Sequence, residues 1–244
     1  MGLVSWWWLL LLSSLSVQRS SDCLPVTRKL DVAVVFHTST RVKLKEVNKV
    51  FKPFLENLFK DSEIDSGQVR VSLGYFNKNC KLLGNLLKYR TKADYAATVM
   101  KLPKSIRGNA INGGAALKKV RTGVFKKKLG DRPDAGNVVV LITDDKTNVK
   151  PALFAEEAEN LRDAGVKIVT LGIANAKEDE LRAVATKGDN TFMVPGYGDL
   201  ATATLTERLR TAMYIRKFLS DREKSDKSKR MSGFRRKQIL FSTH

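Results

Sequence analysis

The chain contains three side chains of the types found in hydrolytic triads, His37, Ser39 and Asp144. A triad works when a histidine, oriented by a carboxylate, takes the proton of a serine hydroxyl, and it is defined by geometry rather than by chain order. Ser39 lacks the Gly-x-Ser-x-Gly surroundings of a nucleophile elbow. The chain also lacks the Gly-x-x-x-x-Gly-Lys and Gly-x-Gly-x-x-Gly motifs of nucleotide sites. We therefore expect a protein that is not an enzyme, with a hydrolase using Ser39 and His37 as an alternative.

Short apolar runs alternate along the chain with stretches of helical periodicity. The runs predict strands over residues 30–36, 69–76, 81–87, 137–143, 167–172 and 191–194. The periodicity predicts helices over residues 42–59, 93–102, 115–125, 151–164, 178–185 and 200–219, the first of them kinked at Pro53. This alternation predicts an α/β fold: a doubly wound, mostly parallel central sheet with one antiparallel edge strand and helices on both faces.

Polar side chains follow the predicted first and fourth strands and fill the Gly/Asn loop at residues 108–114. Open parallel sheets bind ligands beyond the carboxyl ends of their strands, so these segments should meet there. The predicted ligand-binding face consists of His37, Ser39, Arg41, Asn112, Asp144 and Asp145. Arg41 has two possible roles. It either pairs with Asp144 or Asp145, which we favour, or binds a carboxylate or sulfate of a partner bidentately.

Three of these segments, in this order, resemble the von Willebrand factor type A domain family. They are the strand and small-residue loop at residues 31–41, the Gly/Asn loop and helix at residues 108–120, and the strand that ends in Ile142-Thr-Asp-Asp145. The resemblance covers roughly residues 27–219. It implies the doubly wound fold and an extracellular binding or adhesion function.

The resemblance also implies a metal-ion-dependent adhesion site, from which this chain departs. Family members read Asp-x-Ser-x-Ser in the first loop, and they add a Thr from the second loop and an Asp from the third. Here Ser39 and Asp144 match, whereas His37, Arg41 and Ile111 replace an Asp, a Ser and the Thr. Because Mg²⁺ needs several hard oxygen ligands, we expect recognition largely without metal. Binding of Mg²⁺ or Ca²⁺, and with it metal-dependent adhesion, is the alternative.

The N-terminus predicts export. Residues 1–16 carry no charged side chain, and an apolar run from Trp6 to Leu12 precedes small residues. This pattern indicates a signal peptide over residues 1–16, followed by a leader at 17–26, the domain at 27–219 and a tail at 220–244. The alternative, a short membrane anchor, is disfavoured because the run is too short to span a bilayer of ~30 Å. We expect a secreted, extracellular protein without a membrane span.

The net charge of +19 predicts anionic partners. The tail is basic and poor in apolar residues, so we expect it to be disordered. The candidate polyanion-binding residues are Lys126, Lys127, Lys128, Lys227, Lys229, Arg230, Arg235, Arg236 and Lys237. For an exported protein these residues favour glycosaminoglycans or acidic matrix proteins, and we expect no nucleic-acid partner.

The two cysteines, Cys23 and Cys80, leave their pairing open. An exported chain can form disulfides, but the predicted topology places Cys80 at the carboxyl end of the sheet and Cys23 before its other end. Seven extended residues reach about 24 Å, barely enough to join them. An intrachain bond and a disulfide-linked oligomer are equally compatible with the sequence.

These observations predict a secreted extracellular binding or adhesion module that is associated with the matrix. It would recognise protein or matrix ligands through the loops at the carboxyl end of its sheet. The main alternative is a polyanion binder in which the basic tail carries the function.

Overall fold

The computed structural model describes residues 29–214. Within them, one six-stranded sheet has the order β3-β2-β1-β4-β5-β6. The strands are β1 (Leu30–Phe36), β2 (Val69–Phe76), β3 (Cys80–Gly84), β4 (Gly136–Thr143), β5 (Lys167–Ile173) and β6 (Thr191–Val194). Only β3 is antiparallel among these pairings, and it forms one edge. The predicted fold class is confirmed.

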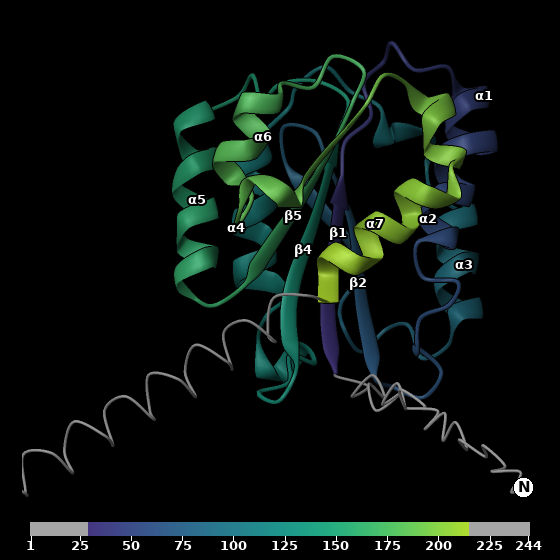
Figure 1. The fold of residues 1–244 in the computed structure, drawn as a ribbon, viewed down its shortest axis with the longest axis vertical. Helices are drawn as coiled ribbons and strands as arrows, with labels where there is room; N and C mark the ends of the chain where they lie inside the picture. Colours follow the sequence, from purple (N-terminus) through teal and green to yellow (C-terminus); the bar gives the residue numbers. More distant parts are fainter. Residues whose placement is uncertain (1–28, 215–244) are drawn as a thin grey trace, which may run out of the picture.

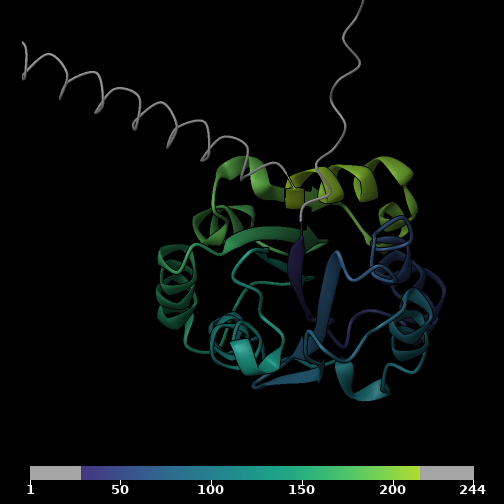
Figure 2. The same cartoon turned by 90° about the horizontal axis from the view of Figure 1, so that it is seen from below.

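Helices cover both faces of the sheet. They are α1 (Leu44–Glu46), α2 (Lys52–Asn57), α3 (Lys92–Met100), α4 (Gly113–Gly123), α5 (Pro151–Asp163), α6 (Glu178–Val184) and α7 (Ala203–Tyr214). Figure 1 shows α4, α5 and α6 on one side of the sheet and α2, α3 and α7 on the other. Figure 2 shows the same layers from below, with β3 at the margin between α4 and α3.

The central strand β1 explains why the core has two halves. Successive side chains of a strand point to opposite faces, and every residue of β1 is buried. Val32, Val34 and Phe36 pack in the half under α2, α3 and α7. Ala33 and Val35 pack in the half under α4, α5 and α6. Because β1 is covered on both faces, the central place in the sheet requires a continuous apolar run.

The end of the sheet opposite the loops is closed by a buried ion pair. Asp31 is fully buried, and it accepts hydrogen bonds from the backbone N–H of Arg132 at 2.8 Å and from its Nε at 2.9 Å. The same guanidinium donates to the carbonyl oxygens of Gly67, Leu30 and Gln68. One arginine thus joins the starts of β1 and β2 to the segment before β4.

Several boundaries differ from the sequence prediction. The helix predicted at 42–59 contains a π-helical segment, Val47–Phe51, before α2. Pro53 has no N–H to donate, and the wider turns that precede it absorb this loss without a break. The third strand begins at Cys80 and ends at Gly84, where an added Cβ would lie 2.7 Å from the Tyr89 ring. The last helix begins at Ala203, after a 3₁₀ turn at Tyr197–Ala201.

Other predictions fall on residues that the structure does not describe. These are the signal peptide, the leader, the tail with its six candidate cations, Cys23 and the end of the last predicted helix. No helix among residues 29–214 is long and apolar enough to cross a membrane.

Candidate functional site

The three predicted loops meet at the carboxyl ends of the parallel strands, at the top of Figure 1. His37 directly follows β1, and Asp144 directly follows the neighbouring β4. The Gly/Asn loop joins them: Gly108 donates its N–H to the carbonyl oxygen of Thr38 at 3.0 Å, and Thr38 forms an isolated bridge with Arg107. The site is therefore built on two adjacent central strands and one loop.

The carboxylate of Asp144 is the centre of this site and is held by three donors. Its Oδ1 lies 3.0 Å from Nδ1 of His37. Its Oδ2 accepts from the backbone N–H of Ser39 at 2.7 Å and from the Tyr197 hydroxyl at 3.0 Å. The Asp144 side chain is only 3% exposed, so water cannot replace these partners.

The charge state of Asp144 follows from its partners. Burial by itself would raise the pKa of this carboxyl group, but the hydrogen bonds from His37 and Ser39 outweigh it and hold the pKa below its usual value. Burial and the neighbouring carboxylate raise the pKa of Tyr197 far above its usual range, so its hydroxyl stays a donor. Asp144 is thus an ionised, internally neutralised carboxylate.

His37 faces Asp144 from the end of β1. Its Nε2 lies 3.0 Å from the carbonyl oxygen of Gly108, and its ring is fully buried. Both ring nitrogens face oxygens that only accept, so a proton on each nitrogen satisfies both contacts. The geometry therefore assigns an imidazolium to His37 and a buried ion pair to His37 and Asp144.

Arg41 and Asp145 lie on the surface of the same loops. Nη1 of Arg41 is 2.5 Å from Oδ2 of Asp145, and the arginine side chain is 67% exposed. Of the two partners expected for Arg41, the structure shows Asp145 and not Asp144. A pair at the surface contributes little to stability. Asp145 is 18% exposed, so Arg41 is the more accessible of the two groups.

Asn112 departs from its predicted role. It is 6% exposed, accepts from the N–H of Ala115 at 2.9 Å and donates to the carbonyl oxygen of Lys78. Asn112 is thus the N-cap of α4 and lies beneath the ligand-binding face. His37, Ser39 and Asp144 are also buried. The correction is the same for all four: they lie buried beneath the loops, whereas Arg41 and Asp145 reach the surface.

The structure brings together the three side-chain types of a triad, but they are not arranged as a triad requires. Nε2 of His37 faces Gly108, and Nδ1 faces Asp144, so neither ring nitrogen is directed at the Ser39 hydroxyl. Ser39 contacts Asp144 through its backbone N–H. A histidine placed this way cannot take the proton of Ser39.

The residues do not fit a divalent cation either. Both oxygens of Asp144 are used by protein donors, and an imidazole ring replaces one expected carboxylate. Ile111, at the position of the expected Thr, is 2% exposed and packs in the core. Residues 29–214 contain no cluster of three or more His, Cys, Asp or Glu that could hold a metal ion. Mg²⁺ and Ca²⁺ prefer several oxygen ligands, which this site does not offer.

Tyr197 is the site residue that sequence reasoning missed. It lies in the 3₁₀ turn after β6, and its ring packs edge-on against Phe51 at 5.9 Å between centroids. No motif marks it. The available signal is its position just after a strand whose carboxyl end lies at the same edge of the sheet.

The remaining predicted residues lie elsewhere. Lys126, Lys127 and Lys128 are exposed in the segment after α4, away from the loops. Cys80 begins β3 and is partly buried, and burial raises the pKa of its thiol to about 12.

The family follows from a comparison with known proteins. A profile of the von Willebrand factor type A domain matches residues 31–207. The chain belongs to this family. The match includes both strands that carry the site and ends inside α7, so the resemblance noted from the sequence is confirmed.

Family members with similar sequences include matrix proteins. The chain is 26% identical to chicken (Gallus gallus) matrilin-3 over 197 residues, which cover 79% of the chain and 42% of the relative. It is 31% identical to the human collagen alpha-6(VI) chain over 180 residues, 71% of the chain and 8% of that relative. The chain thus spans less than half the length of these relatives.

A solved family structure has the same fold. Proximal thread matrix protein 1 from the mussel byssus superposes with a TM-score of 0.70 and 25% identity, over 76% of this chain and 47% of that one. Another structure of the mussel protein has zinc in its metal-ion-dependent adhesion site.

Proposed function

We propose that this protein is a secreted extracellular adhesion module of the matrix, not an enzyme, and that it binds a protein ligand without a metal ion. The proposal rests above all on Asp144. Its carboxylate is saturated by His37, Ser39 and Tyr197, so the charge that a metal would supply comes from the protein itself.

The relatives support the matrix setting of this proposal. Matrilin-3 and collagen alpha-6(VI) share the domain with this chain, as does a mussel thread protein. The chain is shorter than each of these relatives, so partners of the whole proteins are not carried over. A family domain in such assemblies serves as a binding module, and we assign that role here.

The exposed loops supply the recognition surface. Arg41 is exposed and paired with Asp145 by a contact that a ligand can replace. Thr40, hydrogen-bonded to Asn109, adds polar groups beside them. An arginine of this exposure can form two parallel hydrogen bonds with a carboxylate, so an acidic side chain of the partner is the expected anchor.

Binding to matrix proteins with matched variants tests the proposal. Solid-phase binding of the protein to collagens and other matrix proteins is measured in Mg²⁺ and in EDTA. We expect equal binding in the two buffers, and a loss of about tenfold or more for Arg41→Gln, the size expected for an arginine anchor. Lys187→Gln is the control. Lys187 is an exposed residue that follows α6, and its replacement removes one positive charge, as Arg41→Gln does.

Two results would contradict the proposal. Binding abolished by EDTA would show that a cation takes part despite the saturated Asp144. Equal losses for Arg41→Gln and Lys187→Gln would show that the loops are not the binding surface.

A further inference from the structure

The positive charge of the folded domain is concentrated in one continuous part of the chain. Residues 66–130 contain fifteen Lys or Arg and a single acidic residue, Asp94, so their net charge is +14. Residues 131–214 contain ten basic and fourteen acidic residues, a net charge of −4. The charge asymmetry is therefore a property of the domain and does not depend on the tail.

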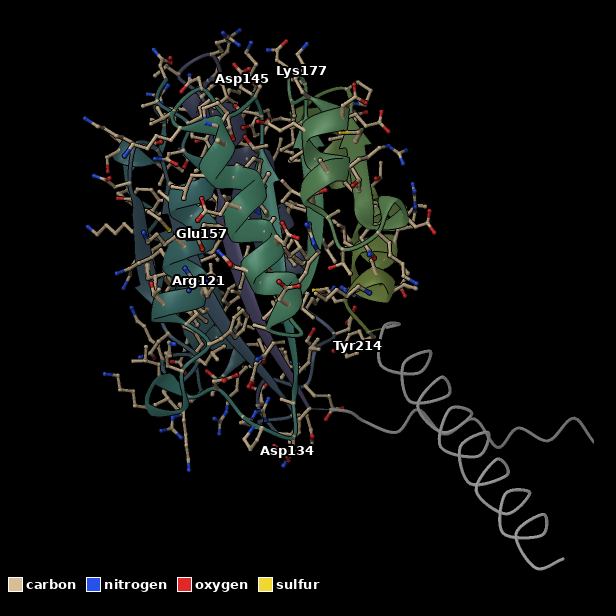
Figure 3. The ribbon with its side chains drawn as sticks, turned by 90° about the vertical axis from the view of Figure 1, so that its left-hand side faces the viewer. Arg121, Asp134, Asp145, Glu157, Lys177 and Tyr214 are labelled. Carbon is tan, nitrogen blue, oxygen red and sulfur yellow. The ribbon has the colours of Figure 1, made fainter. Side chains whose placement is uncertain are left out.

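The fold places this segment on one side of the molecule. It comprises β2, β3, α3 and α4, and among the described residues β3 is an edge strand that pairs with β2 alone. Figure 2 shows β3 at the margin between α4 and α3, opposite β6 and α7. In Figure 3, many side chains along the edge beside α4 end in nitrogen.

Six lysines line the α4 flank of this edge, and we call them the basic edge: Lys78, Lys81, Lys119, Lys126, Lys127 and Lys128. All six are exposed. Lys78 lies in the turn before β3, Lys81 in β3 itself and Lys119 in α4. The other three follow α4, whose eleven residues span about 16 Å.

Several contacts hold these elements together. Lys119 is close enough to lower the pKa of the Cys80 thiol electrostatically, against the larger effect of burial. An added Cβ on Gly123 would lie 3.4 Å from Leu82 of β3. Gly130 packs against Leu87, which follows β3, and accepts a hydrogen bond from Arg70. The six lysines therefore follow one continuous surface along the edge strand.

The charges of the basic edge are not neutralised within the domain. None of the six lysines forms an ion pair with a carboxylate among residues 29–214. The nearby Arg121 is different: it forms a bidentate pair with Glu157 between α4 and α5, as Figure 3 shows. Like charges on one surface repel each other, and binding an anionic polymer relieves that repulsion.

The size of the charge indicates which partner fits. A second copy offers a net charge of only −4 over residues 131–214, too little to balance +14. A linear polymer with a charge in every repeat matches a long strip better than a compact protein does. We propose that the basic edge binds a sulfated glycosaminoglycan, lying along β3 and α4. The choice of this polymer over nucleic acid rests on the matrix location in the proposed function.

Heparin binding of two matched triple variants tests the proposal. Both are made in the full chain with Lys227, Lys229, Arg230, Arg235, Arg236 and Lys237 changed to Gln, so that the tail contributes little to either. The edge variant carries Lys81→Gln, Lys119→Gln and Lys127→Gln. The control variant carries Lys49→Gln, Lys60→Gln and Lys187→Gln, three exposed lysines outside the basic edge.

Affinity for a labelled heparin oligosaccharide is measured at physiological salt. A lysine near an anionic surface contributes about fivefold in affinity, so we expect the edge variant to lose on the order of 100-fold. The control variant should lose less than about threefold, because only screened long-range attraction changes. Equal urea midpoints for the two variants show that both fold.

Three results would overturn the proposal. Equal losses for the two variants would mean that heparin senses only net charge. Equal affinity for heparin and for a DNA duplex of the same length would reject a sulfated polymer as the specific partner. Salt-sensitive self-association that the edge variant abolishes, without heparin binding, would assign the surface to a second copy. Arg41→Gln should keep full heparin affinity, so failure of the proposed function and failure of this inference are separable.

Discussion

Replacing His37 by leucine should destabilise the protein by about 3–5 kcal/mol, the usual cost of removing one partner from a buried ion pair. The leucine is close in size to the imidazole, so the main effect is electrostatic. The Asp144 carboxylate, 3% exposed, loses its only ion-pair partner among residues 29–214. The carbonyl oxygen of Gly108 also loses its donor at 3.0 Å. For a domain stable by about 5–15 kcal/mol, this is a large fraction of the total.

A double-mutant cycle isolates the charge effect from the change in packing. Asp144→Asn keeps an oxygen that can accept from Ser39 and Tyr197 but removes the charge. The double variant His37→Leu/Asp144→Asn should therefore be more stable than His37→Leu alone. Urea unfolding of the wild type, both single variants and the double variant gives the coupling energy.

The pH dependence of the free energy of unfolding in the same variants tests the direction of the Asp144 pKa shift. The folded state lowers the pKa of Asp144 below 3.8, so this carboxylate adds stability above that pH and loses it as the pH falls through the folded-state value. The stability gap between wild type and Asp144→Asn should therefore shrink as the pH falls below 3.8. If the unfolding free-energy changes of the two single variants add up to that of the double variant within about 0.5 kcal/mol, the buried ion pair is refuted.

Three further outcomes follow from the structure. Arg132→Met should lower the free energy of unfolding by about 3–5 kcal/mol, because the buried Asp31 loses its only ion-pair partner among residues 29–214; Asp31→Asn in the same chain should restore part of it in urea unfolding. The midpoint of thermal unfolding should agree within about 1 °C in Mg²⁺ and in EDTA, because an ion without a native site adds no stability; a clear increase in Mg²⁺ would contradict the saturated Asp144. In a Cys23→Ser chain, iodoacetamide at pH 8 should alkylate Cys80 about a thousandfold more slowly in the native state than in urea. The reason is that the folded state raises the pKa of the Cys80 thiol to about 12. Equal rates in the two states would show that the thiol is not buried.

The strands could be read from the sequence because each is a short apolar run between polar or Gly-rich segments. β1 and β6 have the predicted bounds, and β2 does too. The helix after the Gly/Asn loop was placed two residues late, at 115 rather than Gly113. Its start is set by the Asn112 cap, a local hydrogen bond that hydrophobic periodicity does not report.

The candidate site was predictable only in part, for a physical reason. The meeting of His37 with Asp144 follows from the parallel neighbours β1 and β4. Whether a residue faces a ligand or the core depends on side-chain burial, which spacing alone does not give. Asn112 and Ser39 were therefore placed on the face although both are buried. Tyr197 was not predicted as a site residue because its contact with Asp144 joins residues far apart in sequence.

The position of β1 at the centre of the sheet has a consequence for folding. Leu30 pairs with Val69 on one side and with Gly136 on the other, so the second pairing closes a loop of more than one hundred residues. During synthesis the apolar edge of β1 stays open until β4 has left the ribosome. Long-range pairing of this kind folds slowly, on the scale of milliseconds to seconds. The nascent chain therefore exposes one unpaired edge of a hydrophobic strand for much of its synthesis, a state that chaperones recognise.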